Sequence, residues 1–98
     1  MIREMAHITV KPGAQADFEA GVQKALPLFQ RARGFHRLEL HHIIEHPEQY
    51  VLQIHWQTLE DHMKHFRESE DFQAWRGIVG GFFAKAPDVV HTEVVVGE

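Results

Sequence analysis

The stretch YVLQIHWQTLEDHMKHFRESEDF, residues 50–72, contains a change of hydrophobic period that decides the fold. From Tyr50 to Trp56 every second side chain is apolar, which is typical of a half-buried β-strand. After this segment the apolar residues recur at helical spacing. Thr58, with Asp61 three residues later, resembles a capping box at a helix N-terminus. The stretch therefore predicts a strand that leads directly into a helix.

The segments on either side follow the same two periods. Strand alternation is expected at 2–10, 35–45, 50–57 and 89–96, and helical spacing at 14–33, 58–67 and from 69 onward. This order of strand, helix, strand, strand, helix, strand is the split βαβ pattern of an α+β ferredoxin-like sandwich. In such a fold an antiparallel sheet is covered by helices on one face. We expect one domain of this kind over residues 1–98.

Composition narrows the possible functions. Ten Lys and Arg against fourteen Asp and Glu give a net charge of −4, so no basic field favours nucleic acid as a partner. Cysteine is absent, which excludes disulfides, thiolate catalysis and cysteine-ligated metals. No apolar run approaches the roughly 20 residues that span a bilayer, so a membrane partner is not expected. The charged N-terminus is unlike a signal peptide, and we expect a cytoplasmic protein.

Strand alternation separates the sheet into two faces, of which the more apolar should lie against the helices. The residues expected in that layer are Ile2, Ala6, Ile8, Leu38, Leu40, His42, Tyr50, Leu52, Ile54, Trp56, Val90 and Val94. The opposite face combines Met5, Ile43, Val51 and Val89 with polar side chains. Such a mixture is typical of a partly polar subunit interface.

We therefore expect a homodimer formed sheet to sheet. Four of the nine histidines, His7, His41, His55 and His91, belong to the interface side by their position in the strands. A metal site is the alternative interpretation of this group, and polar packing between subunits is favoured over it.

Several of these features together resemble one known family. The strand that ends in Trp56 leads into residues 58–66, the segment Ser69-Glu70-Asp71-Phe72 follows, and Pro87-Asp88-Val89 opens a last strand. This arrangement, over nearly the whole chain, resembles the antibiotic biosynthesis monooxygenase family, whose small ferredoxin-like domains pair into dimeric α+β barrels. Many members share the strand-end tryptophan and a histidine where His65 stands.

The resemblance implies a monooxygenase that oxidises a quinol- or anthrol-type aromatic substrate with molecular oxygen. No cofactor is implied, neither metal nor flavin, because the electron-rich substrate anion can itself reduce oxygen. A non-catalytic dimer of the same fold, structural or binding a small molecule, is the alternative. A haem-degrading relative is less favoured, because Trp75-Arg76 stands where that branch has its axial histidine, and Ala6 or His7 where it has an asparagine.

His62 and His65 are the candidate catalytic bases. They lie three residues apart, so on an α-helix they would share a side, and imidazole titrates near neutral pH. The family match favours His65, whereas the structural alternative is a polar helix shoulder. A metal site is not expected, because the pair lacks an obvious third ligand. Arg76 is the candidate for stabilising an oxyanion or phenolate, and a solvated side chain is the alternative.

Aromatic residues are the candidates for substrate binding. If the layer between sheet and helices holds a cavity, flat side chains would form walls for an aromatic ring. If it does not, the same residues simply fill the core. The residues expected in this role are Trp56, Trp75, His42, Phe66 and Tyr50.

Overall fold

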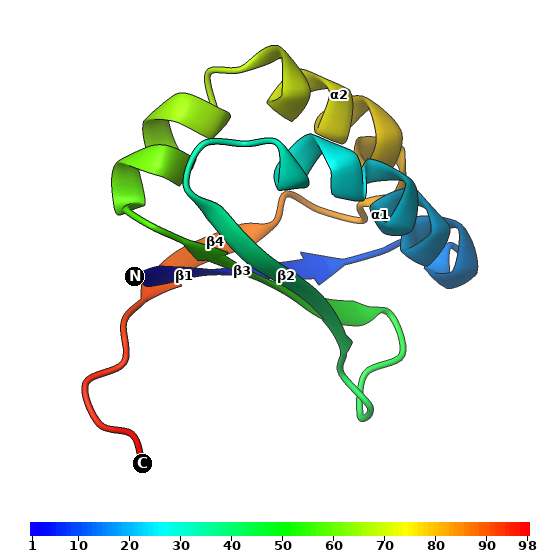
Figure 1. The fold of residues 1–98 in the computed structure, drawn as a ribbon. Coiled ribbons are helices and arrows are strands. Elements are labelled where there is room, and N and C mark those ends of the chain that lie inside the picture. The colour runs from blue at the N-terminus through cyan, green and yellow to red at the C-terminus, as the bar shows by residue number, and fades with distance from the viewer.

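Four antiparallel strands form one sheet in the order β2-β3-β1-β4, and both helices lie across the same face of it (Figure 1). The computed structural model describes residues 1–98. The elements are β1 (Ile2–Thr9), α1 (Gln15–Gln30), β2 (Phe35–His42), β3 (Gln49–Trp56), the π-helical segment η1 (Asp61–Phe66), α2 (Glu70–Val79), the short 3-10 helix η2 (Gly80–Phe82) and β4 (Asp88–Thr92). The α+β ferredoxin-like fold expected from the sequence is confirmed.

The core lies between the sheet and the two helices. The fully buried side chains include Phe18 and Phe29 of α1, and all four residues of the apolar parity of β3. The rings of Phe29 and Trp75 meet edge to face with their centroids 4.9 Å apart, which joins α1 to α2. The cluster comprises Ala6, Ile8, Val10, Phe18, Val22, Ala25, Phe29, Tyr50, Leu52, Ile54, Trp56, Phe66, Trp75 and Val79.

The expected faces are confirmed for β1 and β3 and are wrong for β4. In the antiparallel register Ala6 is paired with Val89 and Glu4 with His91, so Val89 and His91 lie on the helix side. Val90, which was expected in the buried layer, is paired with Met5 on the open face and is 52% exposed. The Val-Val sequence of this strand carries no alternation, so only pairing with β1 determines which face each residue occupies.

Strand β4 is also shorter than expected. It ends at Thr92, which is paired with Arg3, and beyond that position β1 has almost no residues left to pair with. The chain from 93 to 98 therefore leaves the body of the molecule (Figure 1). Val94, placed in the buried layer by the sequence pattern, is 62% exposed, and Val95 and Val96 are more exposed still. The face of the sheet opposite the helices is left uncovered within one chain (Figure 1).

The helix expected at 58–67 forms largely as a π-helix. Its start follows the prediction, because the Thr58 backbone N–H donates to Asp61 and the Asp61 N–H donates to the Thr58 hydroxyl, both at 3.2 Å. At its C-terminal end an i→i+5 bond runs from the Arg67 N–H to the His62 carbonyl. The following helix α2 is capped by Ser69, whose hydroxyl accepts the Phe72 N–H. No helix is long and apolar enough to cross a membrane.

Candidate functional site

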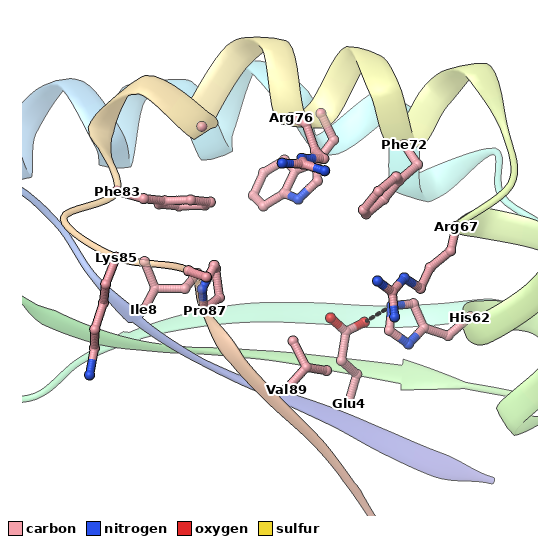
Figure 2. A pocket seen from close by; sticks show the side chains of 13 residues that line it. Glu4, Ile8, His62, Arg67, Phe72, Arg76, Phe83, Lys85, Pro87 and Val89 are labelled. Carbon is pink, nitrogen blue, oxygen red and sulfur yellow. Dashed lines mark ion pairs between the residues drawn. The ribbon is translucent and has the colours of Figure 1, made fainter.

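A cavity of about 540 Å³ opens between the sheet and α2, in the size range of small-molecule sites. Strands β1 and β4 form its floor, α2 forms its roof, and the chain after η2 closes one end (Figure 2). The residues that line it are Glu4, Ile8, His62, Arg67, Phe72, Trp75, Arg76, Gly80, Phe83, Lys85, Ala86, Pro87 and Val89.

The upper part of the cavity is aromatic. Phe72 and Trp75 come from α2 and Phe83 from the chain beyond it, and in Figure 2 the two phenylalanine rings flank the cavity. Ile8 and Val89 supply apolar surface from the floor. Flat apolar walls of this kind suit a planar ring.

A chain of polar groups runs from Glu4 on the cavity floor through His62 to the half-buried His91. Glu4 is only 6% exposed, and its Oε1 accepts the indole N–H of Trp56 at 3.0 Å. The same oxygen lies 3.2 Å from Nε2 of His62, which is 4% exposed. On its other side, Nδ1 of His62 is 2.8 Å from Nε2 of His91, so one of these two nitrogens donates to the other. Glu4, His62 and His91 are therefore in continuous contact.

The second carboxylate oxygen of Glu4 is free. Both protein contacts are made by Oε1, and Figure 2 shows the other oxygen turned into the cavity beneath α2. A buried carboxylate normally has partners for both oxygens. This oxygen is therefore positioned to bind a hydroxyl group of a molecule in the cavity.

Burial moves the pKa values of this group toward neutral forms. Desolvation raises the pKa of Glu4 to about 7, against smaller opposing effects of the Trp56 hydrogen bond and Arg67. Desolvation, with His91 and Arg67, lowers the pKa of His62 to about 4. The pKa of His91 is also lowered, first by desolvation and then by Arg67. Near pH 7 the two imidazoles are neutral and Glu4 exchanges its proton readily, which suits a general base.

The π-helical turn explains why the side chains of His62 and His65 point in different directions. A π-helix has more residues per turn than an α-helix, so positions three apart no longer share a side. Positions four apart do so in η1, where both His62 and Phe66 are buried. His65 points to solvent and does not line the cavity. The expectation that the two histidines share one side is wrong.

The other residues expected at the site divide into three groups. Trp75 and Arg76 line the cavity. Trp56 and Phe66 lie buried beside it. The Trp56 ring stacks on the His62 ring, with their centroids 5.5 Å apart, and also packs against Phe66. His42 and Tyr50 lie away from this cavity.

His42 is exposed at the end of β2, contrary to its expected place in the buried layer, and its Nε2 is 2.9 Å from the Pro47 carbonyl. Tyr50 donates its hydroxyl to Glu19 at 2.5 Å, and its burial together with Glu19 raises the pKa of Tyr50. Both residues line a separate groove beside α1, not the cavity beneath α2.

The sequence analysis did not identify five residues of the site. Four of them line the cavity and the fifth, His91, contacts His62: Glu4, Arg67, Phe83, Lys85 and His91. Only Glu4 carried a usable signal, because it is an acidic residue at an otherwise apolar position of the first strand. His91 was placed on the wrong face, and nothing in the local pattern joins the other three to the cavity. No group of three or more His, Asp or Glu side chains is arranged to hold a metal ion.

The family model for antibiotic biosynthesis monooxygenase matches residues 1–77, more than half of the chain. The chain belongs to the antibiotic biosynthesis monooxygenase family. It is 53% identical to a Bordetella bronchiseptica protein assigned to the same family, whose crystal structure superposes with a TM-score of 0.96 and 97% coverage of both chains. The resemblance seen in the sequence is confirmed.

Two more distant relatives extend the family comparison. The uncharacterized protein YczJ of Bacillus subtilis (strain 168) is 33% identical over 95 residues, which are 97% of this chain and 100% of that protein. SnoaB, a cofactor-independent oxygenase from Streptomyces nogalater, is 18% identical, with a TM-score of 0.84 over 98% of this chain and 94% of its own. At that identity the likeness to SnoaB concerns the fold.

Proposed function

We propose that this family member is a cofactor-independent monooxygenase that oxidises a quinol- or anthrol-type aromatic substrate. The observation that carries the proposal is the free oxygen of buried Glu4, aimed into a cavity with aromatic walls. Family membership and the description of SnoaB as a cofactor-independent oxygenase support the same reaction class.

The reaction begins with a proton transfer. The ionised Glu4 carboxylate takes the phenolic proton through its free oxygen, and His62 and His91 adjust their shared proton behind it. The resulting substrate anion gives one electron to oxygen, and the substrate radical and superoxide join in a new C–O bond. The peroxide then breaks at its O–O bond. One oxygen atom stays in the product and the other leaves as water, with two hydrogens and two electrons that the substrate supplies.

The residues around the cavity divide this work. Trp75 and Phe72 hold the ring, and Arg76 stabilises the negative charge that develops on the substrate. His62 keeps the Glu4 carboxylate in place and exchanges protons with it. His65, the base favoured by the sequence, has no role in this proposal because it lies outside the cavity.

Oxygen uptake with a panel of quinols and anthrones tests the proposal, with no metal or flavin added. General-base assistance is worth about 10²–10⁴-fold, so Glu4→Gln should lower kcat/KM within that range. For the wild type, kcat/KM should rise with pH as Glu4 ionises around its pKa of about 7. His65→Gln is the matched control and should retain activity, whereas His62→Gln should lose it.

Two results would decide against Glu4 as the base, and a third would decide against the oxygenase. Unchanged turnover by Glu4→Gln would remove Glu4 as the base, and a loss confined to His65→Gln would return that role to His65. Tight binding of the panel with no oxygen consumed would favour the non-catalytic alternative, a small-molecule-binding protein of the same fold.

We also propose that the protein is a homodimer formed through the uncovered face of the sheet. Met5, His7, His41, Val51 and His55 lie on that face, which no helix covers (Figure 1). Such a mixture of apolar and polar side chains is typical of a partly polar subunit interface. The role expected for His91 in this interface is not retained, because it lies on the helix side.

Sedimentation velocity at micromolar concentration tests the dimer. The wild type should sediment as a dimer, and Val51→Lys should shift it toward the monomer because a charge would be placed in the interface. Gln23→Lys, on the exposed side of α1, is the control and should leave the dimer intact. A wild-type monomer under these conditions would refute the proposal.

A further inference from the structure

An excess of positive charge surrounds the cavity. Arg67, Arg76 and Lys85 line it, and none of them is within ion-pair distance of a carboxylate. The ion pairs of the chain instead involve Arg31, Arg33, Arg37, His41 and His62. Three cationic residues without a carboxylate partner therefore line one cavity of a chain whose net charge is −4.

The cavity holds little negative charge to balance them. Glu4 is its only acidic lining residue, and because burial raises the pKa of Glu4 to about 7, that carboxyl group is only partly ionised near pH 7. Arg67, at the end of η1, has its guanidinium 5.8 Å from the centroid of the Phe72 ring. In Figure 2 the Arg67 and Arg76 guanidinium groups lie at the cavity, whereas the Lys85 side chain extends away from them.

Charge and shape together indicate the ligand. Arginine is suited to carboxylates because its planar group presents parallel N–H donors, and its face also stacks on aromatic rings. The cavity volume of about 540 Å³ suits a small molecule. A neutral quinol would use the aromatic walls and Glu4, but before its proton is removed it carries no anionic group for the two arginines.

We propose that the natural substrate is an aromatic acid, a phenolic ring bearing a carboxylate that Arg67 and Arg76 bind. This inference rests on the proposed function for the phenolic group. The carboxylate is held at the arginine side, and the phenolic hydroxyl meets the free oxygen of Glu4. The charged group thus orients the ring for proton removal.

Equilibrium binding separates this inference from turnover. The probes are 1-hydroxy-2-naphthoate and 1-naphthol, which differ by the carboxylate alone, and binding to the full chain is followed by calorimetry at pH 7. We expect the acid to bind at least tenfold more tightly. Hydrogen bonds to charged groups are worth roughly 10- to 100-fold in affinity. Arg76→Gln and Arg67→Gln should therefore each lower the affinity for the acid by about that factor.

Controls distinguish a specific contact from general charge and from misfolding. The two arginine variants should bind 1-naphthol as the wild type does, which would also show that the cavity is intact. Lys24→Gln removes a positive charge from the exposed side of α1 and should change neither affinity. Arg76→Lys should recover only part of the affinity, because lysine lacks the planar pair of donors.

The inference is overturned if the acid binds no more tightly than 1-naphthol, or if the arginine variants behave like Lys24→Gln. Tighter binding of 1-naphthyl phosphate than of the acid would overturn the assignment to a carboxylate. Oxygen uptake with 1,4-dihydroxynaphthalene and its 2-carboxylate tests the proposed function separately. If both compounds are oxidised and bind equally well, only the inference of an aromatic acid is contradicted. If the acid binds more tightly but neither compound is oxidised, only the proposed oxygenase activity is contradicted.

Discussion

Replacing Glu4 by glutamine should stabilise the protein at alkaline pH and have little effect at acid pH. The glutamine side chain keeps an oxygen for the Trp56 indole N–H but cannot ionise. In the folded wild type the pKa of Glu4 is raised from 4.5 to about 7. A carboxyl group with a raised pKa contributes stability that is complete below its unfolded pKa and is lost as the pH rises through its folded pKa.

The size of the effect follows from that difference. Each pKa unit corresponds to about 1.4 kcal/mol, so the buried charge costs the wild type about 3 kcal/mol above pH 8. Glu4→Gln avoids this cost. The free energy of unfolding of the variant should therefore exceed that of the wild type by up to about 3 kcal/mol at pH 8, with the difference shrinking toward pH 5.

His62 titrates at the acid end of the same pH range. Its pKa is lowered to about 4, so the stability it contributes is present above its unfolded pKa of 6.5 and is lost as the pH falls. The measurement is urea unfolding between pH 5 and 8, followed by tryptophan fluorescence at one protein concentration, because dissociation of a dimer would alter the midpoint. Glu45→Gln, at an exposed loop position, should show no pH-dependent difference. A difference for Glu4→Gln that stays constant from pH 5 to 8 would refute the reasoning.

Three further predictions concern the framework of the site. Gly34 has φ +77°, and an added Cβ would lie 2.0 Å from a carboxylate oxygen of η1, whereas Gly13 has φ +84° and open space around it. In urea unfolding, Gly13→Ala should lower the free energy of unfolding by about 1 kcal/mol, and Gly34→Ala should lower it further. Equal losses would contradict the steric argument. Ser69→Ala should lose about 1 kcal/mol of unfolding free energy with the α2 cap, whereas Ser69→Asp should lose little, and a loss shared by both would argue against capping. Trp56→Phe removes a hydrogen bond that lowers the pKa of Glu4, so the rise of kcat/KM with pH should move to higher pH. An unchanged pH profile would show that this hydrogen bond does not influence the catalytic base.

Local periodicity was sufficient to predict the fold. The alternation from Tyr50 to Trp56 and the capping residues Thr58 and Asp61 depend only on neighbours in the chain, so the strand and the following helix could be placed without knowledge of the rest. The same applies to the start of α2, where Ser69 acts as the cap.

Which side chains meet at the site depended on contacts that local pattern does not contain. The face occupied by His91 follows from pairing with β1, because a strand of consecutive valines carries no alternation of its own. A π-helical turn directs His62 inward and His65 outward, and the spacing of residues in the sequence does not predict that turn. Glu4 and His62 lie on elements far apart in the chain, and only the packed layer brings them within 3.2 Å. The sequence by itself thus determined the α+β architecture and the family, because both rest on local order. The tertiary structure decided which acid and which histidine share the cavity, because that depends on strand register and helix pitch.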